Sequence, residues 1–215
     1  MVTQAIIPLA GLGTRLLPLS SVIPKELLPI NGKPNLEYIM EECVQAGIRQ
    51  FIFVVPKNRP SIKKYFFNDN FYKKIIKKKK NDKRLKKVFT RIKRYQKMIK
   101  FVYQNKPEGT GDAVLKCKKY LKGKHFLMLL ADDLIVKKNC SKEMIALHKR
   151  TKGSVIATKK VDRKTVSRWG ILGFKNRSKN SFLINEVIEK PKLSEAPSNY
   201  AIIGRYILPK KILSV

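Results

Sequence analysis

QAIIPLAGLGTR, residues 4–15, joins an apolar run to a glycine-rich loop. The first seven residues are typical of a short buried strand, and two glycines and an arginine follow them. Glycine lets the backbone approach a ligand and turn its N–H groups toward phosphate oxygens. Arg15 can donate two charge-assisted hydrogen bonds to the same oxygens. The stretch therefore indicates a strand with an anion-binding exit loop. Taken alone, it also fits a tight strand exit with an exposed arginine.

The alternation of strand and helix continues beyond this loop. Residues 35–47 place apolar side chains on one helical face and end at Gly47, and residues 51–56 are typical of a second buried strand. The same alternation predicts three more strands and two more helices: strands over 99–104, 125–133 and 154–160, and helices over 109–121 and 141–150. This order favours an α/β fold, with a mostly parallel sheet flanked by helices on both faces.

The alternation of strands and helices ends near residue 168. Three strand-like segments follow with no long helix between them: WGILGF (169–174), FLINEVIEK (182–190) and NYAIIGRYIL (199–208). We expect a β-rich extension of the sheet that carries the second half of a cleft. In an open parallel sheet, ligands bind beyond the carboxyl ends of the strands, so the loops there are the candidate site.

The charge of the chain is strongly positive: 48 Lys plus Arg face 15 Asp plus Glu, a formal net charge of +33. Such a field attracts polyanions, so non-specific binding to nucleic acid or another polyanion is expected. The densest stretch, 71–100, has apolar residues at helical spacing and predicts a lysine-coated amphipathic helix over 71–98. A solvated surface and a dedicated nucleic-acid patch are both open, although we expect no exposed aromatic residues for base stacking there.

Several other classes of protein are disfavoured. No apolar run approaches the roughly 18 residues of a membrane span, and the start of the chain lacks a signal-peptide pattern, so we expect a cytoplasmic protein. The three cysteines, Cys43, Cys117 and Cys140, have no metal-like spacing and are interpreted as reduced buried thiols. His125 and His148 are interpreted as structural.

Two familiar phosphate loops do not fit residues 9–15. A Walker A loop needs G-x-x-x-x-G-K-[ST], and the dinucleotide fingerprint needs G-x-G-x-x-G leading directly into a helix. Here Arg15 is followed by two leucines and by Pro18, which breaks an immediate long helix.

The combination of motifs is more specific than its parts. LAGLGTR (9–15) followed by PKELLPI (24–30) resembles the sugar-1-phosphate nucleotidyltransferases, and within them the bacterial UTP:glucose-1-phosphate uridylyltransferases. Later segments are similar to that family in the same order: YQNKPEGTGDAV (103–114), LLADDLIV (129–136), RWGIL (168–172), VIEKPK (187–192) and APSNYAIIGRYIL (196–208).

The resemblance implies a Rossmann-like nucleotidyltransferase fold in a single domain, 1–215. Residues 1–165 would form the nucleotide-binding part, including the basic segment 71–98, and 166–215 a β-rich sugar-binding part. The implied reaction joins UTP and glucose 1-phosphate to give UDP-glucose and pyrophosphate, a step of nucleotide-sugar metabolism. Because two polyanions must be brought together, the task is charge neutralisation and alignment.

The resemblance also implies roles for single residues on the nucleotide side. Five residues would read the uracil ring: Ala10, Gly11, Glu26, Gln104 and Gly109. Four would hold the triphosphate: Gly13, Thr14, Arg15 and Lys25. Among these, Arg15 would compensate charge on the departing pyrophosphate.

On the metal and sugar side, Asp132 would hold Mg²⁺, a cation that takes a carboxylate together with phosphate oxygens. Gly170 and Glu189 would take the glucose hydroxyls, and Lys190 would hold the sugar phosphate near the attacking oxygen. Trp169 is expected to pack beside this sugar site and to fill a core position.

The chain departs from the family pattern at a few places. Ala131 stands where proline is usual, and Asp112 stands where histidine is common. The family's E-x-x-x-T-D helix and C-terminal part, which contribute to subunit contacts, have no counterpart here, so we expect weakened nucleotide binding and impaired catalysis. A homo-oligomer is a further expectation. Two alternatives are open: a relative that uses dTTP or another sugar 1-phosphate, and a non-catalytic binder of polyanions.

Overall fold

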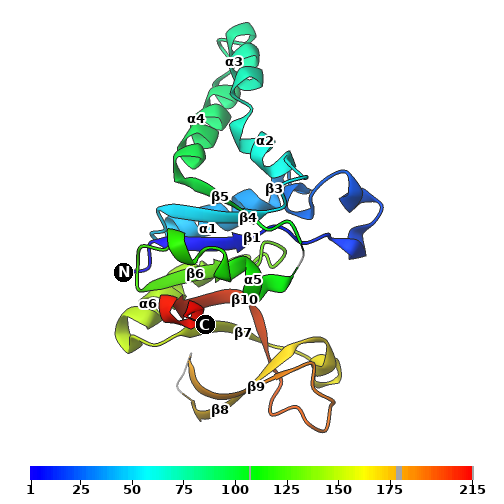
Figure 1. Cartoon of the computed structure of the whole chain (residues 1–215), viewed down its shortest axis with the longest axis vertical. Helices are drawn as coiled ribbons and strands as arrows, with labels where there is room; N and C mark the ends of the chain where they lie inside the picture. Colours follow the sequence, from blue (N-terminus) through cyan, green and yellow to red (C-terminus); the bar gives the residue numbers. More distant parts are fainter. Residues whose placement is uncertain (107, 178–180, 215) are drawn as a thin grey trace.

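The computed structural model describes residues 1–106, 108–177 and 181–214, and Pro107 of the segment 103–114 therefore lies outside the described residues. Figure 1 shows a central sheet with helices packed against it and a helical hairpin that projects from one end. The α/β fold expected from the alternation of strands and helices is confirmed.

The centre of the sheet is parallel. Its first four strands lie in the order β5 (Ile99–Tyr103), β4 (Gln50–Val55), β1 (Gln4–Pro8) and β6 (His125–Leu129). In β1, the backbone of Ile6 pairs with Ile52 on one side and Met128 on the other. Because these strands are parallel, the loops after all four leave the sheet at the same edge.

Alternating side chains of the strands bury two apolar clusters, one on each face. Ile7, Phe51 and Phe53 pack under α1 (Asn35–Gln45), α4 (Lys83–Met98) and α6 (Cys140–Thr151). Ile6 and Ile52 point to the other face and pack under α5 (Gly109–Leu115). Each fully buried side chain of this size contributes about 1.5–3 kcal/mol, so the sheet is a firm platform for its loops.

The basic segment forms a hairpin of helices rather than one helix. After α2 (Ser61–Phe67), α3 (Asp69–Lys78) ends before α4 begins at Lys83. Asp82 is the N-cap of α4, because its side chain accepts a hydrogen bond of 2.9 Å from the Leu85 backbone N–H. Phe71 on α3 is 57% exposed, so the expectation that this stretch has no exposed aromatic residue is wrong.

The last three strands extend the main sheet beyond β6, as expected for a β-rich extension. β10 (Tyr200–Pro209) runs antiparallel to both β6 and β7 (Val155–Lys160), with a register shift between Ile202 and Tyr206. Its other end pairs with β8 (Gly170–Arg177), which forms an antiparallel pair with β9 (Phe182–Glu189). β10 therefore connects the β8–β9 pair to the end of β6.

The remaining expectations concern isolated residues. The three cysteines are free thiols, but Cys140 is only half-buried, so the expectation that all three are buried is wrong for that residue. Burial raises the pKa of Cys117 to about 12, which disfavours its thiolate. Trp169 is 39% exposed, so the expectation that it fills a core position is wrong. None of the helices in the described part of the chain combines the length and the hydropathy that a membrane span requires.

Candidate functional site

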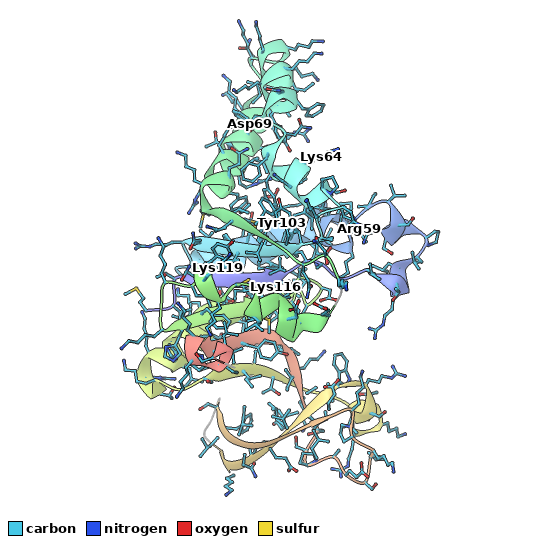
Figure 2. All side chains as sticks on the ribbon, viewed as in Figure 1. Arg59, Lys64, Asp69, Tyr103, Lys116 and Lys119 are labelled. Atoms are coloured by element: carbon cyan, nitrogen blue, oxygen red, sulfur yellow. The ribbon has the colours of Figure 1, made fainter. Side chains whose placement is uncertain are left out.

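The loops after β1, β4, β5 and β6 meet at the carboxyl edge of the sheet, where α/β folds bind ligands. They carry most of the expected nucleotide residues. The loop after β1 is the large blue one in Figure 1, and Figure 2 shows Arg59, which follows β4, at its base.

The glycine loop is shaped by a left-handed residue and held from behind. Gly13 has a φ of +66°, and a Cβ there would lie 3.1 Å from the Cβ of Ser20. The Ser20 hydroxyl donates a hydrogen bond of 2.8 Å to the Gly13 carbonyl, and the Arg59 guanidinium donates one to the Ser20 carbonyl. Thr14 and Arg15 are exposed in the short 3-10 turn that follows, so both are accessible to an anion.

Lys25 and Asp132 meet across the edge of the sheet. The Lys25 Nζ donates a hydrogen bond of 2.7 Å to the Asp132 Oδ2, and the Asp132 side chain is 55% exposed. Burial pushes the pKa of Asp132 upward, but the hydrogen bond and charge of Lys25, with the more distant charge of Arg15, outweigh burial and lower this pKa. A cation and an ionised carboxylate therefore lie side by side at the carboxyl edge of the sheet.

Glu26 is buried next to this pair. It is 2% exposed, and burial raises the pKa of its carboxyl to about 7, against the opposing charges of Lys25 and Arg59. Such a group can donate a hydrogen bond when protonated and accept one when ionised. That range of behaviour suits recognition of a ring that carries both an imide N–H and carbonyl oxygens.

Gln104 is fixed at the end of β5 by three contacts. Its backbone N–H donates to the Val55 carbonyl at 3.0 Å. Its side-chain amide donates to the Gly109 carbonyl at 3.1 Å and to the Asp112 carboxylate at 2.7 Å. Asp112, one of the departures from the family pattern, therefore orients the predicted base reader. Lys116, labelled in Figure 2, neutralises Asp112 at 2.7 Å and, together with Gln104, lowers the pKa of Asp112.

The predicted sugar residues come together where β8 begins and β9 ends. Gly170 pairs with Glu189 across the two strands, and a Cβ on Gly170 would lie 3.0 Å from the Glu189 Oε2. Lys190 has a φ of +49°, and its Nζ lies 3.6 Å from the Glu189 Oε1. Both side chains are exposed, so a carboxylate and an ammonium group stand side by side.

Strand β10, which carries the half-buried Tyr206, joins this sugar group to the Asp132 turn. Burial raises the pKa of Tyr206 on β10, and the charges of Asp133 and Glu189 raise this pKa further. A Cβ on Gly170 would lie 3.3 Å from the Ile202 Cδ1, and two residues further along β10 the Gly204 N–H donates a hydrogen bond of 2.8 Å to the Asp133 carboxylate. The structure thus brings the loops of the parallel strands and the β8–β9 end to one region.

Sequence reasoning missed several residues that shape the site, because their partners are distant in the chain. The Asp133 Oδ2 accepts a hydrogen bond of 2.8 Å from the Gly204 backbone N–H, so one of its two carboxylate oxygens is engaged with β10. In the described part of the chain, no group of three or more His, Cys, Asp and Glu side chains is placed to hold a metal ion. Asp132 therefore offers a single carboxylate.

Known proteins are similar to this chain over nearly its whole length. A relative from Staphylococcus saprophyticus, named UTP–glucose-1-phosphate uridylyltransferase, is 37% identical over 98% of this chain and 73% of its own length. One of the same name from Streptococcus pyogenes is 35% identical over 100% of this chain and 71% of its own length.

Solved structures are similar over the whole chain. The UTP-bound UGPase from Acinetobacter baumannii has a TM-score of 0.90 at 33% identity and is matched over 76% of its length. A UDP-glucose pyrophosphorylase complexed with UDP-glucose has a TM-score of 0.84 at 30% identity, with 78% of its length matched. The Nucleotidyl transferase family matches residues 4–215. The chain therefore belongs to the nucleotidyl transferase family.

Proposed function

We propose that this chain transfers a uridylyl group from UTP to glucose 1-phosphate, forming UDP-glucose and pyrophosphate. The observation that carries the proposal is the Lys25–Asp132 pair, at 2.7 Å, which stands beside buried Glu26 at the carboxyl edge of the sheet. The relatives and solved structures of that name support the choice of substrates.

The reaction needs alignment and charge compensation more than covalent catalysis. An oxygen of the sugar phosphate attacks the α-phosphorus of UTP, a new P–O bond forms, and the bond to pyrophosphate breaks in line with it. A phosphate oxygen is already a nucleophile at neutral pH, so no general base is required. Arg15 and Lys25 neutralise the triphosphate, and Lys190 holds the sugar phosphate against the repulsion of the second anion.

The donor set at Asp132 fits a magnesium ion that is bound together with the nucleotide. Mg²⁺ is commonly held by one or two carboxylates plus substrate phosphates, and Asp132 supplies one exposed carboxylate. When bound there, the metal would supply a positive charge between phosphate oxygens. Lys25, which otherwise neutralises Asp132, would then be released to contact the triphosphate.

Recognition of the base rests on buried groups. Glu26 and Gln104 are 2% and 4% exposed, so a ring that fails to pair with the Glu26 carboxyl leaves a polar group unpaired in a dry site. Backbone groups of Ala10, Gly11 and Gly109 would complete the contacts to uracil. Gly170 and Glu189 would contact the glucose hydroxyls from the other side.

A substrate panel tests the proposal and its nearest alternative. The chain is incubated with Mg²⁺, with UTP or dTTP, and with glucose 1-phosphate or galactose 1-phosphate, and nucleotide sugars are separated by chromatography. We expect UDP-glucose as the main product. A dTDP-sugar as the main product would replace the proposal with a thymidylyltransferase, and no product from any pair would contradict both.

A second function is favoured by the charge on the helical hairpin. Figure 2 shows long side chains radiating from α3 and α4. Among the described residues, the exposed lysines of α3 that lie away from Asp69 form no ion pair: Lys74, Lys77 and Lys78. We propose that this hairpin binds polyanions without sequence preference. A homo-oligomer and a cytoplasmic location stay predictions.

A further inference from the structure

The turn that carries Asp132 is fixed on both sides by contacts from distant elements. Arg205 on β10 donates hydrogen bonds to the Leu130 carbonyl at 3.2 Å and to the Asp133 carbonyl at 2.8 Å. The Asn35 side chain, at the start of α1, donates to the Ala131 carbonyl. The carbonyls of Leu130, Ala131 and Asp133 are therefore all held by side chains.

β10 adds backbone contacts to the same turn. The Leu130 N–H donates to the Gly204 carbonyl at 2.9 Å, while the Gly204 N–H donates to the Asp133 carboxylate. A Cβ on Gly204 would lie 2.6 Å from both the Asp133 Oδ2 and the Leu130 Cβ, so only glycine allows this approach. The Asp132 carboxylate, by contrast, is exposed at the carboxyl edge of the sheet, where its side chain is 55% exposed.

Arg205 is itself held rigidly by a buried counter-charge. Its side chain is fully buried, and its guanidinium lies 2.9 Å from the Glu42 Oε2 and 3.3 Å from the Glu42 Oε1. Glu42, on α1, also accepts a hydrogen bond of 3.0 Å from the Ser141 backbone N–H at the start of α6. The pair therefore ties α1, α6 and β10 to the turn.

Stability alone does not explain a buried ion pair at this place. Well-packed apolar side chains often replace such pairs with no loss of stability, because they avoid the desolvation of two charges. An apolar pair would not, however, hold the two carbonyls that flank Asp132. The specific consequence of Arg205 is thus the orientation of the turn.

We propose that Arg205, fixed by Glu42, is a positioning residue that orients Asp132 toward the metal–nucleotide complex. The inference rests on the proposed function, because Asp132 has a metal to bind only if the chain binds a nucleotide with its cation. Arg205 acts through the backbone of the turn and is not expected to touch substrate. Partners that orient a metal ligand typically contribute 10–100-fold to metal affinity or activity, so an effect of about 10-fold is expected here.

The test compares two double variants with the same chemical change. Glu42→Leu with Arg205→Met removes the clamp and leaves no unpaired buried charge. Glu37→Leu with Arg91→Met removes a second ion pair of a buried α1 glutamate, which joins atoms 2.7 Å apart but ties α1 to α4 instead of to the turn. Thermal unfolding first establishes that each variant is folded.

Binding of Mn²⁺ in the presence of UTP is then measured by electron paramagnetic resonance, together with kcat and the KM for glucose 1-phosphate. We expect the clamp variant to bind Mn²⁺ about 10-fold more weakly, with a lower kcat and an unchanged KM for the sugar phosphate. The control variant should keep the wild-type values. Equal Mn²⁺ affinity and kcat in the folded clamp variant and the wild type would overturn the proposal.

A conservative substitution covers the case in which the clamp variant does not fold. Arg205→Lys keeps the charge beside Glu42 but removes the planar fork that reaches two carbonyls. We expect the same 10-fold loss of Mn²⁺ affinity, and wild-type affinity in this variant would overturn the proposal. If the wild type itself binds no Mn²⁺ with UTP, the proposed function fails and this inference fails with it.

Discussion

At the scale of single residues, the site contains charged side chains that pair with each other although each is predicted to bind a different part of the ligand. Lys25 and Asp132 are predicted to serve the triphosphate and the metal, yet they neutralise each other at 2.7 Å. Glu26, buried beside them, has its pKa raised to about 7. Protonation of the Glu26 carboxyl is therefore coupled to both folding and ligand binding.

Glu26 should make stability depend on pH. In the folded chain its pKa is about 7, against an ordinary value of 4.5, so the folded state holds a proton that the unfolded state releases between these values. The free energy of unfolding should fall by up to about 3 kcal/mol as pH rises from 4.5 to 7. Urea unfolding of wild type and Glu26→Gln across this range measures the difference, and parallel profiles would contradict it.

Gly13 should tolerate no side chain, whereas Gly11 should. Gly13→Ala places a Cβ in the left-handed region and 3.1 Å from Ser20, which should cost about 1–2 kcal/mol of stability. No atom lies within 4 Å of a Cβ on Gly11, so Gly11→Ala is the matched control. Equal unfolding free energies for the two variants would show that the loop is not held as described.

At the scale of elements, the periodicity of apolar residues predicted single helices and strands, but it did not predict how distant strands pair. The apolar spacing of the basic segment predicted one amphipathic helix over 71–98, and the helical periodicity is confirmed in α4, where Ile92 and Tyr95 are buried. The break before Lys83 was missed, because Asp82 was not interpreted as a helix cap. The place of β10 between β6 and β8 could not be read from the sequence, since strand pairing joins residues far apart in the chain.

The residues of the candidate site likewise fall into those that sequence motifs predict and those that depend on tertiary contacts. Residues that follow a strand, such as Arg15, Gln104 and Asp132, could be located from motifs, because the parallel sheet brings strand ends to one edge. Asp112 as a partner of Gln104, and Arg205 as a partner of the Asp132 turn, depend on tertiary contacts. No spacing in the sequence indicates such contacts.

The cap of α4 offers a test at this scale. Asp82→Ala removes the acceptor for the Leu85 N–H and should destabilise the hairpin by about 1 kcal/mol. Asp82→Asn keeps an acceptor and should cost less. Hydrogen exchange of the α4 amides measures the local effect, and unchanged protection in Asp82→Ala would contradict the assigned cap.

At the scale of the whole molecule, a net charge of +33 acts on every anionic partner. Some attraction to RNA follows from the total alone, so the informative question is where binding is concentrated. Figure 1 shows α3 and the adjoining part of α4 projecting away from the sheet and its ligand edge. Binding there should leave the substrate site open.

Two sets of four substitutions distinguish local from global charge. Lysine-to-glutamine changes at 74, 77, 78 and 80 in and after α3 should reduce the salt slope of single-stranded RNA binding by about one for each phosphate that is no longer neutralised. The same changes at 118, 119, 122 and 124, exposed lysines before β6, lower the net charge equally and should have a smaller effect. Equal slopes for the two variants would indicate that the hairpin is only a solvated surface.

The central claim is that a nucleotide and a sugar phosphate react at the edge where Asp132 stands. Pyrophosphate release from UTP and Mg²⁺ tests it most directly, with and without glucose 1-phosphate, in the wild type, Asp132→Asn and Asp69→Asn as a carboxylate control on the distant α3. We predict release that requires glucose 1-phosphate, survives in Asp69→Asn and is lost in Asp132→Asn. Release by the wild type that persists at the same rate in Asp132→Asn, or no release at all, would contradict the claim.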